Sequence, residues 1–101
     1  MVGEGVPDGA TVDADGFVWS AQYGGAVINR FASDGTLVRS IPVPVTQPTC
    51  VTFGGPDYAT LFITTARQRL APEVLAREPL AGAVLAIEPG ARGLPEPRFA
   101  L

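Results

Sequence analysis

Short runs of alternating apolar and polar residues, separated by turn sequences, fill the first 43 residues of the chain. Four such runs follow one another: GATVDA (9–14), FVWSAQY (17–23), AVINRFA (26–32) and LVRSIPV (37–43). An alternation with a period of two is typical of a β-strand with one buried face. The connections contain Asp-Gly or Gly-Gly pairs, which supply the positive φ that tight hairpins require. The pattern predicts a four-stranded antiparallel meander.

The same pattern then starts again. Three pairs of segments align: VPDGATVDA (6–14) with QPTCVTFGG (47–55), FVWSAQ (17–22) with LFITTA (61–66), and GAV (25–27) with GAV (82–84). The first two offsets fall in the ~40–45-residue range typical of propeller blades. The third offset is larger, which indicates an insertion in the second unit.

The insertion falls on QRLAPEVLAREPL (68–80), where Pro72 opens a run that predicts one or two turns of helix. EPRFAL (96–101) would supply a last strand. We therefore expect an all-β chain with one blade over 6–44 and a second, with its helical insertion, over 47–101. Two blades do not close a ring, because propellers usually need ~4–8. The chain is expected to be part of a larger protein or to assemble with partners.

The absence of histidine narrows the chemistry that the chain can support. It excludes Ser-His-Asp and Cys-His nucleophile pairs and the usual histidine-containing zinc sites. Any chemistry must use carboxylates, hydroxyls, amides, arginines or an oxygen-ligated metal. The lone Cys50 excludes an internal disulfide, which agrees with a reducing compartment.

The charge and hydropathy patterns exclude several kinds of partner. The net charge is −3, and the seven arginines are dispersed along a chain without lysine, so no nucleic-acid footprint is expected. No apolar run approaches the roughly 18 residues of a membrane-spanning helix. The N-terminus lacks the pattern of a secretory signal. We expect a cytoplasmic protein that binds neither nucleic acid nor a membrane.

Asp8 is the candidate site residue. Pro-Asp-Gly is a common turn sequence, and most examples bind nothing. The aligned position in the second unit is Thr49, so the architecture does not require aspartate there. A residue just before the innermost strand of a blade lies at the mouth of the propeller channel. An acidic residue there is suited to bind a metal or to act as a general base.

Structural roles are expected for several other notable residues. Asp13 and Asp15 resemble the start of an EF-hand loop, but the spacing fails and a hairpin turn is the better interpretation. Cys50 is expected in the core. Trp19 and Phe53 are expected to pack between blades.

Three further residues have more than one interpretation. Thr49 is expected to face the channel beside Asp8. Arg67 is suited to anchor the 68–80 insertion through carbonyl groups or to bind an anionic substrate. Tyr23, beside Gly24 and Gly25, is suited either to contact a ligand or to pack.

The motifs together resemble those of a known family. PDGATVDADGFVWSAQYGG, INRFASDG, PTCVTFGG, LFITTAR and PLAGAVLAIEPGARGLPEPRFA occur here in the same order as in the C-terminal third of the gluconolactonase/regucalcin family. This family is also called the senescence marker protein or luciferin-regenerating enzyme-like family. The resemblance extends from Pro7 to Ala100. It implies that the chain contributes about two blades of a six-bladed β-propeller.

The resemblance also implies a chemistry. Family members are typically sugar-lactone hydrolases with one divalent metal, calcium or zinc, which would polarise the lactone carbonyl and activate a water. The family's Pro-Asp-Gly aspartate, a metal ligand and suggested general base, corresponds to Asp8. The other family ligands and its substrate-binding residues lie upstream and have no counterpart in this chain. One carboxylate supplies only one of the 6–8 oxygens that calcium usually takes.

Two hypotheses follow from the sequence. In the first, the chain is part of a metal-dependent lactonase that converts an aldonolactone such as gluconolactone to the aldonic acid, with Asp8 as one metal ligand. The specific lactone or ester, including arabinolactone and xylonolactone, stays open. In the second, the chain is a catalytically inactive two-blade module that self-assembles or pairs with another chain.

Overall fold

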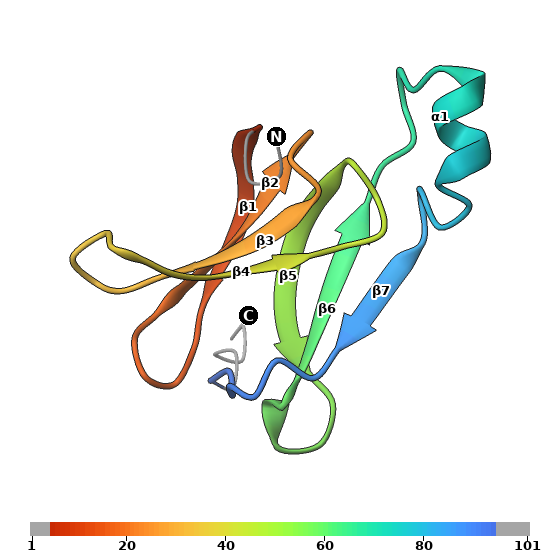
Figure 1. Cartoon of the computed structure of the whole chain (residues 1–101). Coiled ribbons are helices and arrows are strands. Elements are labelled where there is room, and N and C mark those ends of the chain that lie inside the picture. The colour runs from red at the N-terminus through yellow and green to blue at the C-terminus, as the bar shows by residue number, and fades with distance from the viewer. Residues whose placement is uncertain (1–4, 95–101) are drawn as a thin grey trace, which may run out of the picture.

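The computed structural model describes residues 5–94, which fold into two antiparallel sheets with a short helix outside them (Figure 1). The elements, in chain order, are β1 (Val6–Val12), β2 (Val18–Tyr23), β3 (Val27–Phe31), β4 (Leu37–Pro42), β5 (Pro48–Gly54), the 3₁₀ turn η1 (Pro56–Tyr58), β6 (Thr60–Thr65), α1 (Pro72–Arg77) and β7 (Val84–Ile87).

The first sheet has the strand order β1-β2-β3-β4, and the second has the order β5-β6-β7. All neighbouring strands are antiparallel, so the predicted four-stranded meander is confirmed. The aligned segments of the sequence occupy equivalent strands, with β1 matched to β5 and β2 to β6. The predicted helix also begins at Pro72. The expected last strand, 96–101, lies outside the described residues.

The core lies where the two sheets face each other. One layer consists of Trp19, Ala21 and Ile28 from the first sheet, and the other of Val51, Phe53, Leu61 and Ile63 from the second. The Trp19 and Phe53 rings meet edge to face, with centroids 5.9 Å apart. Burial of each large side chain stabilises the fold by about 1.5–3 kcal/mol. The expectation that these two aromatics pack between the sheets is confirmed.

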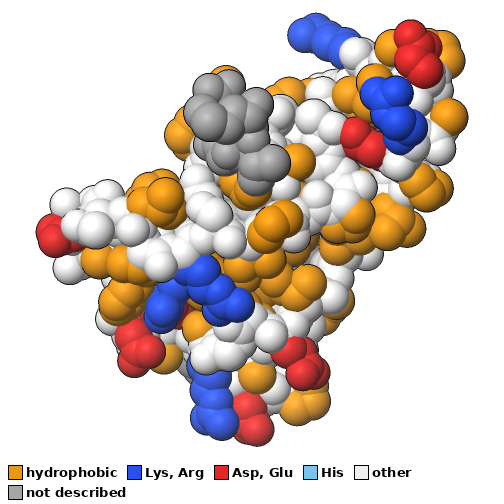
Figure 2. Space-filling view, in the orientation of Figure 1, with side chains coloured by type: hydrophobic (Ala, Val, Ile, Leu, Met, Phe, Trp, Pro, Cys, Tyr) orange, Lys and Arg blue, Asp and Glu red, His pale blue; other side chains and the backbone are white. Residues whose placement is uncertain are grey.

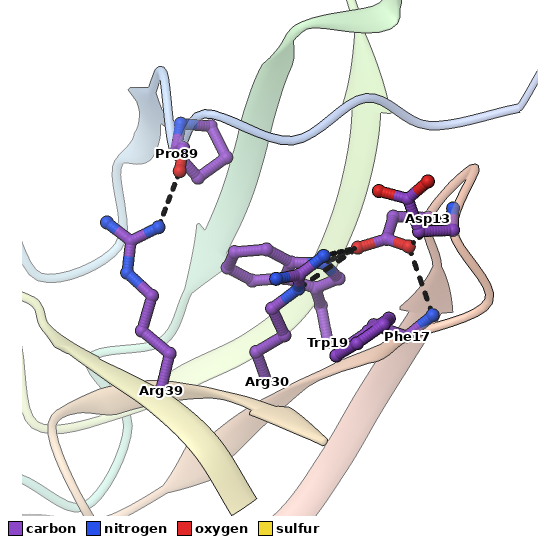
Figure 3. Close-up of polar contacts among 7 residues, drawn as sticks. Asp13, Phe17, Trp19, Arg30, Arg39 and Pro89 are labelled. Atoms are coloured by element: carbon purple, nitrogen blue, oxygen red, sulfur yellow. Dashed lines mark hydrogen bonds and ion pairs between the residues drawn. The ribbon is translucent and has the colours of Figure 1, made fainter. Parts of the chain in front are cut away.

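Asp13 joins a turn to this core (Figure 3). Its Oδ1 accepts hydrogen bonds from the backbone N–H groups of Asp15 and Phe17, as expected of a hairpin-turn residue. Its Oδ2 accepts from the indole N–H of Trp19 at 2.8 Å and forms an ion pair with Arg30 at 2.8 Å. The turn that the sequence predicted is therefore also the anchor of the central tryptophan.

The segment after β7 returns between the sheets beside the same turn. The backbone N–H of Ala14 donates to the carbonyl of Arg92 at 2.7 Å. Gly93 lies against Phe53 so closely that an added Cβ would be 2.2 Å from the Phe53 Cβ. Arg39 on β4 donates to the Pro89 carbonyl at 2.5 Å (Figure 3). These contacts fix residues 89–93 at the edge of the core.

Charged side chains of both signs are spread over the face shown in Figure 2, with apolar side chains between them. Several of the exposed apolar residues lie on the outer faces of the sheets. By strand register, Val12 and Leu37 lie on the face of the first sheet that points away from Trp19, and Val84 lies on the corresponding face of the second. Their exposed fractions are 48%, 52% and 65%.

The Asp13 network predicts acid-sensitive stability. Burial alone raises the pKa of Asp13, but hydrogen bonds from Trp19, Phe17, Arg30 and Asp15 outweigh it and hold the pKa below its ordinary value. Because the folded-state pKa is depressed, the stabilisation is present above the unfolded-chain value of about 3.9 and is lost as the pH falls through the folded-state pKa. Asp13→Asn should lower the free energy of unfolding at pH 7 by about 2–4 kcal/mol.

Urea unfolding over a pH series measures this effect. The unsubstituted chain should lose stability below about pH 4, and Asp13→Asn should flatten that loss. Asp15→Asn in the same turn is the control, because the Asp15 side chain is exposed and only its backbone N–H takes part in the network. An equal acid sensitivity in all three proteins would contradict the assignment.

Candidate functional site

Asp8 lies within a strand and not in a turn. The sequence placed Pro7-Asp8-Gly9 before the first strand, but β1 already begins at Val6, so that expectation is corrected. In the β1–β2 register, Pro7 pairs with Gln22 and Ala10 with Ser20, which leaves two residues, Asp8 and Gly9, opposite one. This arrangement is a β-bulge, a device that redirects a side chain and recurs next to active sites.

The second sheet repeats the bulge at the equivalent place. In the β5–β6 register, Pro48 pairs with Thr65 and Cys50 with Thr64, so Thr49 is the extra residue. Asp8 and Thr49 therefore occupy equivalent positions of the two sheets, as the sequence alignment predicted. The Thr49 hydroxyl lies 2.7 Å from the Thr64 hydroxyl. Thr49 does not line the hollow at Asp8 that is described next.

Asp8 is exposed and lines an open hollow of about 410 Å³. The hollow is lined by Val6, Pro7, Asp8, Tyr23, Gln68 and Arg69. Figure 1 shows why segments so distant in sequence meet: β1 begins, and β2 and β6 end, at the same end of the molecule, where the chain leaves for α1. Tyr23 was a candidate from the sequence. Gln68 and Arg69 were missed as individual residues because they lie inside the insertion.

A hydrogen-bonded network holds this part of the insertion against β2. The buried Gln47, in the amide orientation that satisfies its neighbours, donates to the carbonyls of Gln68 (3.1 Å) and Ala66 (3.3 Å) and accepts from the Tyr23 hydroxyl (3.0 Å). The Gln68 amide in turn donates to the Tyr23 oxygen at 3.4 Å. The backbone at 66–68 is thereby fixed relative to the end of β2.

Glu78 fixes the far end of the insertion. Its carboxylate accepts from both the backbone N–H of Thr46, at 2.7 Å, and the Thr46 hydroxyl. The Arg67 side chain lies against Gly82, with its Cδ 3.3 Å from the position of an added Cβ. The sequence left two roles open for Arg67, an anchor of the insertion or a ligand for an anionic substrate, and this packing agrees with a place beside the insertion. Arg69, and not Arg67, lines the hollow.

The glycine of Pro-Asp-Gly has a steric function. A Cβ on Gly9 would lie 2.4 Å from the Cys50 sulfur and 2.8 Å from the Cys50 Cα. Only glycine allows β1 and β5 to approach this closely beside Asp8.

Cys50 itself is exposed, which corrects the expectation that it is a core residue. The reason is strand alternation, because its neighbour Val51 points into the core.

The described residues supply one carboxylate to the hollow and do not by themselves fit a metal ion. Within residues 5–94, no three side chains of aspartate, glutamate, cysteine or histidine lie close enough together to hold one. A calcium site usually needs 6–8 oxygen ligands. Asp8 is thus suited to be one ligand of a shared site, or a base that accepts a proton from water.

The close approach at Gly9 gives a direct test of the site's framework. Gly9→Ala should lower the free energy of unfolding by about 1–3 kcal/mol, because the new methyl group forces β1 away from β5. Thermal unfolding measures the change. The control is Ala10→Gly, which makes the reverse exchange on the same strand and so measures the effect of strand propensity. Gly16→Ala would be a less suitable control, because Gly16 has a positive φ of 83°, at which alanine is strained. An unchanged stability for Gly9→Ala would contradict the steric role.

Comparison with known proteins identifies relatives of the chain. Residues 2–67 match the model of the SMP-30/Gluconolactonase/LRE-like region. A 6-deoxy-6-sulfogluconolactonase of Pseudomonas putida is 44% identical over 95% of this chain and 33% of its own length. An L-arabinolactonase of Azospirillum brasilense is 38% identical over 96% of this chain and 32% of its own. The crystal structure of regucalcin, a calcium-binding protein of Agrobacterium tumefaciens, superposes with a TM-score of 0.87 at 34% identity, covering 94% of this chain and 32% of that one.

The chain therefore spans about one third of the length of these relatives. Among the described residues, no helix is both long and apolar enough to cross a membrane.

Proposed function

The chain belongs to the SMP-30/gluconolactonase/LRE-like family, and from that premise we propose that it forms part of a metal-dependent sugar lactonase. In this proposal it provides two blades, 6–44 and 47–101, of a six-bladed propeller, and one metal ligand, Asp8. The substrate is an aldonolactone, and the product is the corresponding aldonic acid.

The observation that carries the proposal is the exposed Asp8 carboxylate on a β-bulge. The bulge is present in both sheets, but only the first carries an acidic side chain at that position. Asp8 lines a hollow together with the neutral polar residues Tyr23 and Gln68. A polyhydroxylated lactone needs both a charged group at its reacting carbonyl and neutral groups for its hydroxyls.

The chemistry available to Asp8 itself is proton transfer and metal ligation. In lactone hydrolysis, water attacks the carbonyl carbon, the ring C–O bond breaks, and the ring oxygen leaves as a hydroxyl group. A carboxylate within hydrogen-bond reach of the attacking water accepts its proton and, as the resulting carboxylic acid, returns it to the departing ring oxygen. The proposed metal is calcium or zinc, and calcium is supported by the calcium-binding relative. Its remaining ligands would come from outside the described residues.

Replacement of Asp8 tests the proposal. In the active protein that contains this chain, Asp8→Ala should lower kcat/KM for an aldonolactone by at least about 100-fold and weaken divalent-metal binding, because a ligand or base is lost. Titration calorimetry with calcium and with zinc, and a pH-stat assay of acid release, measure the two effects. Asp15→Ala removes an exposed turn carboxylate outside the hollow and is the matched control. Unchanged hydrolysis and metal affinity in Asp8→Ala would refute the assigned role.

A second candidate, an inactive module that assembles with other blades, is favoured by the exposed outer sheet faces. Val12 and Leu37 on one face and Val84 on the other leave apolar surface at both sides of the chain. In a propeller each blade packs against two others, so both faces would be covered by further sheets.

Light scattering of the isolated chain, with a metal-binding assay, separates the candidates. A chain that self-assembles should have a mass above the 10.5 kDa of one copy. Val84→Asp should dissociate that assembly, because it places a charge in the apolar contact. Asp57→Asn, on an exposed turn, is the control. A monomeric chain would contradict self-assembly. The exposed sheet faces would then be covered by other blades of the larger protein.

A further inference from the structure

We propose that Arg69 selects lactones that carry an anionic substituent, such as a carboxylate or sulfonate, away from the reacting carbonyl. This inference rests on the lactonase function proposed above and adds the substrate class to it. It assigns a specificity role to a residue of the insertion, whereas the proposed reaction uses the carboxylate on β1.

The composition of the hollow supports this assignment. Of the six described residues that line it, Arg69 is the only basic one. Tyr23 and Gln68 are neutral polar residues, hydrogen-bonded to each other and, through the Tyr23 hydroxyl, to Gln47, so neither supplies the positive charge that an anion needs. A guanidinium adds a planar pair of N–H donors, which matches the two oxygens of a carboxylate or sulfonate.

Among residues 5–94, Arg69 has no ion-pair partner. The ion pair within 4.0 Å in this part of the chain joins Arg30 to Asp13, which follows the end of β1, whereas the hollow lies at the start of that strand. Asp8 shares the hollow with Arg69, but the two side chains form no ion pair within that distance. A cation in the same hollow also offsets the repulsion that Asp8 would exert on an anionic substrate.

The backbone holds Arg69 in an uncommon conformation. Its φ is 60°, in the left-handed region that non-glycine residues rarely occupy. Such a conformation is strained for a residue with a Cβ and persists where the surroundings enforce it, often at ligand sites. The chain is fixed on both sides of Arg69, by the contacts of Gln47 to the carbonyls of Ala66 and Gln68 before it and by those of Glu78 to Thr46 after it.

The test compares two substrates that differ only in charge. The first is an aldonolactone with a neutral terminal hydroxymethyl group, and the second has a carboxylate in its place. In the active protein that contains this chain, Arg69→Gln should lower kcat/KM for the anionic lactone about tenfold, mainly through KM, and change that for the neutral lactone less than about twofold. Arg69→Lys should give an intermediate loss, because it keeps the charge without the planar pair of donors.

Arg77→Gln is the matched control, since it removes the same charge from the last turn of α1, outside the hollow. The preference for the anionic lactone should also fall between 50 mM and 500 mM NaCl in the unsubstituted protein and stay low in Arg69→Gln.

The outcomes separate the two proposals. If the unsubstituted protein hydrolyses neither lactone, the lactonase function is wrong and the specificity role falls with it. If it hydrolyses both, and Arg69→Gln lowers both rates equally or neither, or if Arg77→Gln has the same effect, the specificity role alone is overturned.

Discussion

The close contact between two twisted sheets is the constraint on which the rest of this structure depends. Trp19 and Phe53 meet edge to face in that contact, and Gly9 lets the first strands of the two sheets approach where any side chain would collide with Cys50. Asp13 holds the tryptophan from one end of the sheet through its indole N–H. The opposite ends of the strands are left free to carry the hollow around Asp8. The packed contact of Asp13 with Trp19 and the exposed carboxylate of Asp8 thus lie at opposite ends of the same strands.

The insertion extends this scaffold without interrupting it. Residues between β6 and β7 leave the sheet, form α1 and return, while the strands on either side still pair in register. Two polar attachments determine where this excursion lies, one through Gln47 and one through Glu78. The first uses the side chain of Gln47, in the connection between β4 and β5, and the second is a contact of Glu78 with Thr46 in the same connection. That connection therefore determines where the insertion, with Gln68 and Arg69, lies beside the hollow.

Much of the fold was predictable, because period-two alternation and Asp-Gly or Gly-Gly turns are local signals. The internal repeat also identified Thr49 as the counterpart of Asp8, and the matching bulges confirm it. Three features were not predictable locally. Pro-Asp-Gly has turn composition yet lies in a bulged strand, since pairing with β2 overrides turn propensity. Cys50 sits in an apolar run but on its exposed face. Arg69 reaches the hollow only through long-range contacts that no sequence period encodes.

The repeated bulge has a consequence for how function is distributed in such a fold. The backbone feature that presents Asp8 occurs twice, directly after a proline and opposite the equivalent antiparallel strand, β2 in one sheet and β6 in the other. The two sheets therefore offer nearly equivalent positions, and the difference between them lies in one side chain, aspartate in one and threonine in the other. The main chain is nearly equivalent in the two sheets, whereas the side chain at the bulge differs in its chemistry. In a protein built from such repeats, a single codon change at an already prepared position is enough to move, add or remove a reactive group.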